Sequence, residues 1–193
     1  MNNKIAIGCL IQWYEIELVE EYLQSVKNAV DMIDNKEDVI IDLYFNTDET
    51  LEKVDENKTS MVHICDKFNK ILYDIFGYDE ETISLVGCSY DIRLSNKGPS
   101  NKLYTIADYR RDFNNNFCDE AEVLMWGETD SLIPRQTFQI LDNLHMSVKD
   151  KTPKYVSFFA TCKMWDESWK MLEHPEFTDK PFIDMDKIDT ENW

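Results

Sequence analysis

The first fifty residues hold two apolar runs separated by one amphipathic stretch, and this order constrains the fold more than any other feature. Residues 4–11 and 39–45 are short runs rich in isoleucine, as expected for buried strands. Between them, residues 17–30 carry apolar side chains at helical spacing. A strand, a helix and a strand in succession predict a βαβ unit with a parallel pair of strands. We therefore expect an α/β fold whose sheet is mixed, mostly parallel, and flanked by helices.

The rest of the chain continues the same alternation and fits one domain spanning residues 1–193. Apolar periodicity predicts two further helices before a third buried strand, and one helix after it. Residues 95–101, with Gly98 and Pro99, predict a loop, and Pro134 suits the first turn of the last helix. The expected elements are helices at 59–76 and 104–117, short strands within 82–94, a strand at 122–126, a helix from Pro134 to about Val148, and a strand at 155–160.

Polar residues follow each of the first two predicted strands. Gln12 to Glu15 come directly after the first strand, and Asn46 to Asp48 come after the second. The carboxyl ends of parallel strands meet at one edge of a sheet, and ligands of open α/β sheets bind beyond that edge. The sequence therefore predicts that these two polar segments lie at one binding edge.

The strongest local signal is Glu128-Thr129-Asp130, at the end of the predicted strand 122–126. Two carboxylates at positions i and i+2 of a turn can reach one cation from the same side. Mg²⁺ and Mn²⁺ prefer oxygen ligands and often take one or two carboxylates together with substrate phosphates. On spacing alone, a solvated acidic turn is the commoner explanation in so acidic a chain, so the motif needs its context.

That context resembles the middle of the family 2-type glycosyltransferases, which have the GT-A fold. The matching residues are a helix start at 106–112 (IADYRRD), the apolar strand 123–126, the acid-x-acid motif 128–130 and the Leu-Ile-Pro at 132–134. The likeness extends over about residues 4–50 and 102–160, as pattern more than as identity. It implies a GT-A-like domain that transfers a sugar from a nucleoside-diphosphate sugar to an acceptor hydroxyl with the help of Mn²⁺ or Mg²⁺.

The resemblance also implies roles for individual residues. Asp130 would coordinate the divalent cation, and Glu128 would contact the metal, a water or the donor. Asn46 and Asp48 lie where the family has an acidic loop that binds the nucleoside. The residues expected to line the pocket of the base are Gln12, Trp13 and Tyr14, of which the two aromatic residues could equally be pieces of the core.

Two adjacent arginines are candidates for the phosphates or sugar of the donor. Arg110 and Arg111 lie in the predicted helix 104–117, and arginine binds phosphate oxygens well. The alternative is that they form surface ion pairs with Asp108 or Asp112. Both alternatives remain open from the sequence.

Three departures from the family pattern weaken the resemblance. The first acid of the motif is Glu128 instead of aspartate, and the loop at 46–48 lacks the glycine that is usual there. The general base of the family lies well downstream of the motif, and the segment after Asp130 is short. Asp184 or Asp186 could act as the catalytic base, and the sequence could lack part of the acceptor-binding half.

Charge and composition exclude several classes of function. The net charge is −18, from 38 acidic and 20 basic residues, which disfavours nucleic acid and anionic membranes as partners. No segment approaches the roughly 18 consecutive apolar residues of a membrane span. The N-terminus does not resemble a signal peptide, so we expect a cytoplasmic protein without an integral membrane segment. Its partners would be a nucleoside-diphosphate sugar and a glycan, lipid-linked or protein acceptor.

Two alternatives to a glycosyltransferase remain. A nucleotidyltransferase-like enzyme could use the same sheet and the same acidic turn, and a degenerate GT-A-like domain could bind a partner without catalysis. The chain has neither a GxxxxGK[ST] nor a GxGxxG motif, which disfavours P-loop kinases and dinucleotide oxidoreductases. Its five cysteines are widely spaced and predict buried, reduced thiols instead of zinc or disulfide sites.

Overall fold

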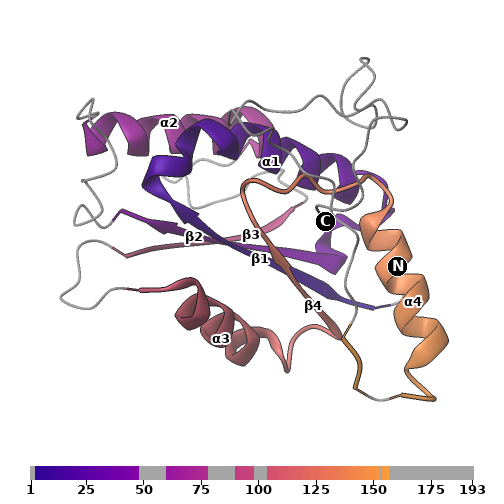
Figure 1. The fold of residues 1–193 in the computed structure, drawn as a ribbon. Coiled ribbons are helices and arrows are strands. Elements are labelled where there is room, and N and C mark those ends of the chain that lie inside the picture. Colours follow the sequence, from indigo (N-terminus) through magenta and orange to yellow (C-terminus); the bar gives the residue numbers. More distant parts are fainter. Residues whose placement is uncertain (1–2, 48–59, 78–89, 98–103, 153, 157–193) are drawn as a thin grey trace, which may run out of the picture.

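The computed structural model describes residues 3–47, 60–77, 90–97, 104–152 and 154–156, which form an α/β fold. One four-stranded parallel sheet, in the order β3-β2-β1-β4, lies between helices (Figure 1). Its strands are β1 (Ile5–Gln12), β2 (Val39–Asn46), β3 (Asp91–Lys97) and β4 (Val123–Gly127). The helices are α1 (Ile16–Val30), α2 (Met61–Phe76), α3 (Ile106–Phe117) and α4 (Thr137–Val148), with short 3-10 helices η1 (Trp13–Glu15) and η2 (Lys36–Asp38).

The predicted βαβ unit is confirmed as β1, α1 and β2. The two strands pair in parallel from Ile5 opposite Val39 to Gln12 opposite Asn46, so their carboxyl ends are level. The four described strands are all parallel, and the antiparallel strand that a mixed sheet requires is not among them.

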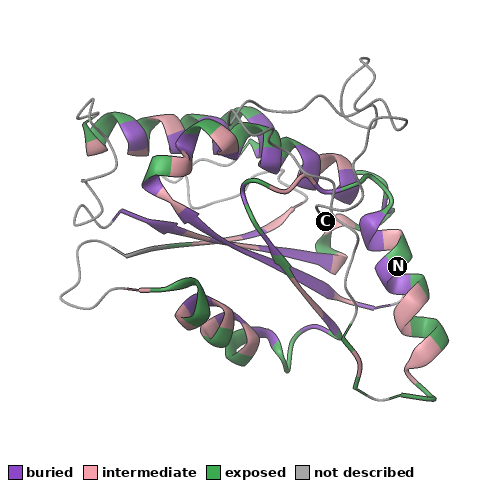
Figure 2. Ribbon diagram, in the orientation of Figure 1, coloured by how far each residue is buried: buried purple, intermediate pink, exposed green. Residues whose placement is uncertain are grey.

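One face of the sheet carries the main hydrophobic core. Alternate side chains of β1 and β2 point toward α1 and α2, because successive residues of a strand face opposite sides. These side chains are aliphatic or aromatic apart from one thiol, and nearly all are fully buried (Figure 2). They are Ile5, Ile7, Cys9 and Ile11 of β1, and Val39, Ile41, Leu43 and Phe45 of β2. Phe138 and Leu141 of α4 join the same core.

The other face is covered by α3, which packs over β1 and β4. Its core is smaller and is built around Tyr109, Phe113 and Phe117 of α3. Gly8 of β1 lies under this helix, and an added Cβ there would come within 2.5 Å of the Phe113 ring. The helix therefore lies close to the strand because that position has no side chain. A capping box between Thr105 and Asp108 fixes where α3 begins.

Two sequence predictions differ from the structure, one about the first residues of a loop and one about the start of a helix; residues 98–101 of that loop lie outside the described residues. Residues 95–97 belong to β3 and not to the predicted loop, because they pair with Tyr44, Phe45 and Asn46 of the longer neighbouring strand. Backbone pairing thus extends a polar segment as a strand where local composition favours a turn. Pro134 precedes α4, whose N-cap is Gln136, and its carbonyl accepts a hydrogen bond from the amide of Thr137.

Other predictions are tested only in part. Residues 155 and 156 are not in a strand, and the remainder of the predicted strand 155–160 lies outside the described residues. Cys9 is buried as predicted, whereas Cys118 is exposed at the end of α3. None of the helices in the described ranges is both long enough and apolar enough to cross a membrane.

Candidate functional site

The order of the strands creates a switch point between β1 and β4. From β1 the chain adds β2 and then β3 on one side, and it returns to the other side of β1 to add β4. The carboxyl ends of β1 and β4 lie side by side because the two strands pair in parallel, and open α/β sheets bind ligands in the crevice beyond such a point. The two segments at this crevice are η1 and the turn Gly127-Glu128-Thr129-Asp130 (Figure 1).

Glu15 joins these two segments through one carboxylate oxygen. Its Oε2 accepts hydrogen bonds from the backbone amide of Gln12 at 3.1 Å and from the hydroxyl of Thr129 at 3.0 Å. Burial raises the pKa of Glu15, these two hydrogen bonds lower it, and the carboxylates of Asp130 and Glu128 raise it further. The acidic motif and the end of β1 are thus held together by a desolvated carboxylate.

Gln12 and Asn46, predicted to contact the donor, are brought together by the pairing of β1 with β2. The Asn46 Nδ2 atom donates to the Oε1 atom of Gln12 over 2.9 Å, and Asn46 is buried. Asp48, the third polar residue predicted for this edge, lies outside the described residues.

Arg110 reaches the acidic motif from α3. Its guanidinium forms an ion pair with Glu128 and lies 5.1 Å from the ring centroid of Trp126. The Nε atom of Arg110 is buried and has no hydrogen-bond partner within the described part of the chain. Trp126 is 48% exposed, and its indole nitrogen donates to Asn114 at 3.2 Å. A cation, an aromatic face and the acidic motif therefore adjoin one another.

Both carboxylates of the motif are exposed, and Asp130 is the one without an ion pair in the described ranges. Its hydrogen-bond partner is the hydroxyl of Ser131 at 3.5 Å, and no basic side chain of the described ranges pairs with it. These ranges contain no group of three or more His, Cys, Asp or Glu side chains arranged to hold a metal ion. The donor set fits a cation that takes one or two carboxylates here and its other ligands from water and phosphate.

The remaining predicted site residues lie elsewhere or outside the described ranges. Arg111 pairs with Asp108 and Asp112 at 3.1 Å, which is the surface ion pair that the sequence left open. Trp13 is 3% exposed and belongs to the core, whereas Tyr14 is 42% exposed beside it. The two aspartates considered as catalytic bases, Asp184 and Asp186, lie outside the described residues.

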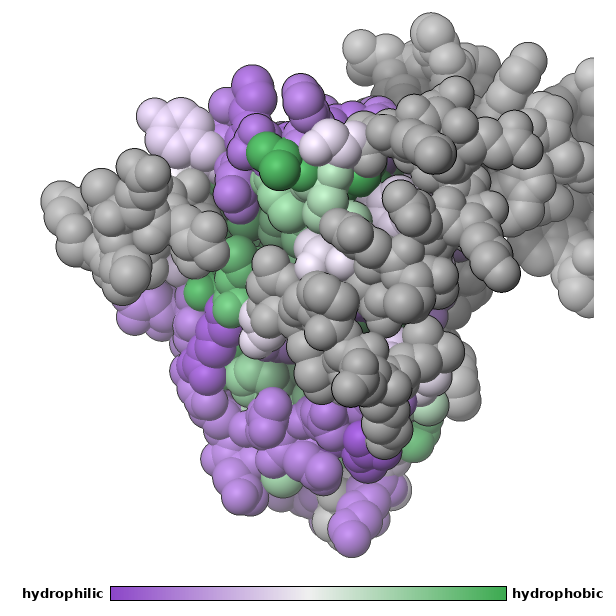
Figure 3. Space-filling view, turned by 90° about the vertical axis from the view of Figure 1, so that its left-hand side faces the viewer, coloured by the Kyte–Doolittle hydropathy of each residue, from purple (hydrophilic) through white to green (hydrophobic). Residues whose placement is uncertain are grey.

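Figure 3 looks onto the side of the molecule toward which β1 and β2 run. Hydrophilic residues gather in the lower part of this view, at the height of α3, and a band of more hydrophobic residues lies above them. Further hydrophilic residues lie above this band in the same view.

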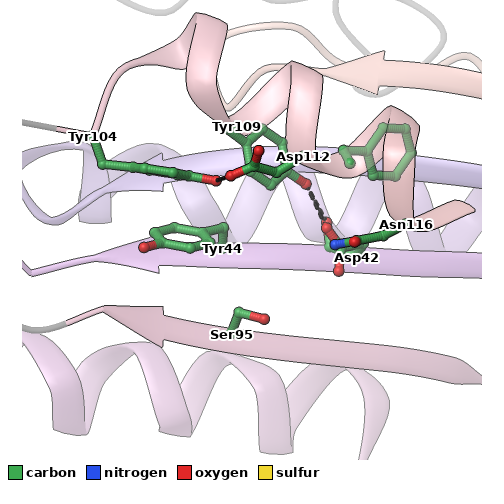
Figure 4. Close-up of a pocket in the computed structure, with 8 residues that line it drawn as sticks. Asp42, Tyr44, Ser95, Tyr104, Tyr109, Asp112 and Asn116 are labelled. Atoms are coloured by element: carbon green, nitrogen blue, oxygen red, sulfur yellow. Dashed lines mark hydrogen bonds between the residues drawn. The ribbon is translucent and has the colours of Figure 1, made fainter.

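A pocket opens on the α3 face of the sheet, with a volume of about 270 Å³ (Figure 4). It is lined from β2, β3 and α3, mainly by tyrosines and carboxylates. Asp42 and Asn116 lie at one end of it, and the stacked rings of Tyr44 and Tyr104 lie at the other. Its lining residues are Asp42, Tyr44, Ser95, Tyr104, Tyr109, Asp112, Phe113 and Asn116.

Sequence reasoning missed this pocket, and it also missed the role of Glu15. The one available signal for the pocket was Asp42, an acid inside the apolar run 39–45. An acid in a buried strand needs a partner, but its partner, Tyr109, is 67 residues away. Only the packing of α3 on this face of the sheet brings them together.

Comparison of the chain with protein-family models, with curated proteins and with solved structures gives no match. The argument for a function therefore depends on the geometry of the site.

Proposed function

We propose that this chain is a GT-A-like glycosyltransferase that moves a sugar from a nucleoside-diphosphate sugar to an acceptor hydroxyl, assisted by Mn²⁺ or Mg²⁺. The observation that carries the proposal is the hydrogen bond from Thr129 to Glu15, because it holds the acidic motif at the switch point between β1 and β4. Ligands of open α/β sheets bind at such a point.

Each part of the donor would meet a suitable group at this edge. Gln12 and Asn46 supply amide donors and acceptors for the nucleoside, and they are preorganised by their mutual hydrogen bond. Arg110 supplies positive charge beside the motif, where the diphosphate would otherwise meet an acidic surface. Since Arg110 now pairs with Glu128, donor binding would replace one anionic partner of the guanidinium by another.

Asp130 would provide a carboxylate ligand to the cation because it has no competing basic partner among the described side chains. A bound divalent cation supplies Lewis-acid stabilisation of the departing diphosphate. The acceptor hydroxyl would lose its proton to a carboxylate, for which Asp184 and Asp186 remain the sequence candidates.

The test is calorimetric titration of the full chain with a panel of nucleoside diphosphates and their sugars, with and without Mn²⁺. We expect one nucleotide family to bind in a metal-dependent manner. Asp130→Asn removes one carboxylate charge and should weaken this binding at least about tenfold, equivalent to roughly 1.4 kcal/mol. The matched control is Asp119→Asn, an equally exposed aspartate after α3, near the amino end of β4.

Equal binding to wild type and Asp130→Asn would disprove the metal role of the motif. Release of pyrophosphate from a nucleoside triphosphate, instead of a nucleoside diphosphate from a sugar donor, would favour the nucleotidyltransferase alternative. Failure of the folded chain to bind any member of the panel would favour a non-catalytic domain.

A further inference from the structure

Asp42 is a half-buried carboxylate in an interior strand, and it forms no ion pair with any described residue. It lies in β2 between Gly8 of β1 and Arg93 of β3. Arg93 is already paired with Asp91, at 3.2 Å, and with Glu120. Burial raises the pKa of Asp42, and the hydrogen bond from Tyr109 and the positive charge of Arg93 oppose this rise. A partly desolvated carboxylate gains from a cationic partner, and Asp42 lines a pocket that could admit one.

Two of the tyrosine hydroxyls that line the pocket already donate to carboxylates. Tyr109 donates to Oδ2 of Asp42 at 2.7 Å, and Tyr104 donates to Oδ2 of Asp112 at 2.9 Å (Figure 4). Burial, followed by the effect of these carboxylates, raises the pKa of both tyrosines, so both keep their protons. The hydroxyls of Tyr109 and Tyr104 are therefore committed as donors. A ligand that binds either carboxylate would have to bring a hydrogen-bond donor of its own.

Aromatic rings and the local charge favour a cation. Tyr44 and Tyr104 stack with centroids 4.6 Å apart, and Tyr109 lies 5.9 Å from Tyr44. Aromatic faces attract ammonium groups electrostatically. The hydroxyl of Tyr44 is buried and has no hydrogen-bond partner among the described residues, so it too is available to a ligand. The carboxylates of Asp42 and Asp112 would repel a phosphate.

The geometry points to a binding site for the primary ammonium group of a small organic molecule in this pocket, with Asp42 as its counter-ion. An ammonium group brings three donors and no acceptor, which matches a lining whose charged groups are acceptors. The volume of about 270 Å³ lies near the lower limit, about 300 Å³, of pockets that bind small ligands. The site thus suits an amine of about the size of a monosaccharide.

This inference goes beyond the proposed function and does not depend on it. The donor site lies at the carboxyl ends of β1, β2 and β4 and takes Arg110 from α3, whereas this pocket is lined by other residues of β2 and α3 and by Ser95 of β3. Asp130→Asn should weaken metal-dependent nucleotide binding and leave amine binding intact, so failure of one proposal is distinguishable from failure of the other.

The experiment titrates the full chain with glucosamine and with glucose, which differ at one position in an ammonium or a hydroxyl group. Putrescine and 1,4-butanediol form a second matched pair. We expect each amine to bind at least about tenfold more tightly than its neutral counterpart, and Asp42→Asn to remove this preference. Asp119→Asn serves as the charge control, and thermal unfolding of each variant checks that it folds.

Three results would overturn the inference. The first is equal affinity for the amine and its neutral partner, and the second is an unchanged preference in a folded Asp42→Asn variant. The third is that neither amine binds the folded wild-type chain at millimolar concentration. If uridine, cytidine or adenosine binds instead and Asp42→Asn abolishes that binding, the pocket recognises a base and not an ammonium group.

Discussion

The two faces of the sheet are built from alternate residues of the same strands, yet they have opposite character. Toward α1 and α2, β2 presents Val39, Ile41, Leu43 and Phe45, all of them buried and apolar. Toward α3 the same strand presents Ile40, Asp42, Tyr44 and Asn46. Adjacent residues of one strand therefore have different roles. Those on one face pack in the hydrophobic core, and those on the other face supply polar groups.

Within one sheet, one face stabilises the fold and the other carries the polar groups that could bind a ligand. The apolar face buries large side chains against two long helices, and burial of apolar area is the main favourable term in folding. The α3 face leaves Asp42 and two tyrosines around a pocket. Polar groups can be positioned there because the opposite face already holds the strands in place.

The largest expected effect lies on the apolar face. Ile41 is 1% exposed in an interior strand, so Ile41→Ala should lower the free energy of unfolding by about 2–5 kcal/mol, through lost burial and a residual cavity. Ile41→Val should cost about 0.5–1.5 kcal/mol. Urea denaturation followed by circular dichroism measures both. A loss below that of the valine variant would contradict the assignment of stability to this face.

The second effect tests the close approach of α3. Gly8→Ala would place a Cβ 2.5 Å from the Phe113 ring and 2.7 Å from the hydroxyl of Tyr109, so we expect a loss of about 1–3 kcal/mol from overpacking. The pocket beside Tyr109 should change with it, visible in the near-ultraviolet signal of the tyrosines. Gly77→Ala is the comparison: nothing lies within 4 Å of its added Cβ, and its φ of 69° costs about 1–2 kcal/mol through backbone strain alone. An unchanged tyrosine signal in Gly8→Ala would contradict this packing.

A smaller, pH-dependent effect is expected at Asp42. Burial holds its pKa above the ordinary value, so the folded state binds the proton more tightly than the unfolded state, and stability falls as pH rises through the folded pKa. Asp42→Asn resembles the protonated form. Its stability relative to wild type should rise as the pH increases from the ordinary aspartate pKa of about 3.9 through the raised pKa of the folded state, and then level off. Urea denaturation across this range, with Asp119→Asn as control, measures the difference. A pH-independent difference would contradict the buried charge.

The smallest effect on stability is expected at the carboxyl edge. Glu128 is exposed and pairs with Arg110 at the surface. Glu128→Gln should change the free energy of unfolding by less than about 1 kcal/mol, since exposed ion pairs contribute little. The same variant should alter nucleotide binding, which calorimetry measures. A large loss of stability together with unchanged binding would show that the motif serves the fold and not a ligand.

The order of elements could be predicted from the sequence because it depends on local patterns. The apolar runs of β1, β2 and β4 and the helical spacing of α1 and α2 are contained in short segments, and each agrees with the structure within a few residues. Residues 95–97 could not be predicted as a strand, because their conformation comes from pairing with β2. Local composition favoured a loop, and tertiary pairing overrode it.

For the carboxyl edge, the sequence predicted which residues lie near one another but not all of the contacts that they make. Parallel strands imply that Gln12 and Asn46 lie close together, and the structure shows them hydrogen-bonded. Which arginine reaches the motif could not be predicted: Arg110 and Arg111 are adjacent in sequence, but their positions on α3 direct one to Glu128 and the other to Asp108. The pocket around Asp42 required the placement of α3 on the sheet, which no local pattern specifies.

The bridge formed by Glu15 has a consequence for loop engineering. One oxygen fixes both the amide of Gln12 at the start of η1 and the hydroxyl of Thr129. A loop grafted from another protein in place of residues 128–130 would keep its position only if it offered a hydroxyl where Thr129 stands. Without that hydroxyl, the graft would also loosen the turn after β1. The two turns therefore form one exchangeable unit, and a change of specificity at this edge has to replace them together.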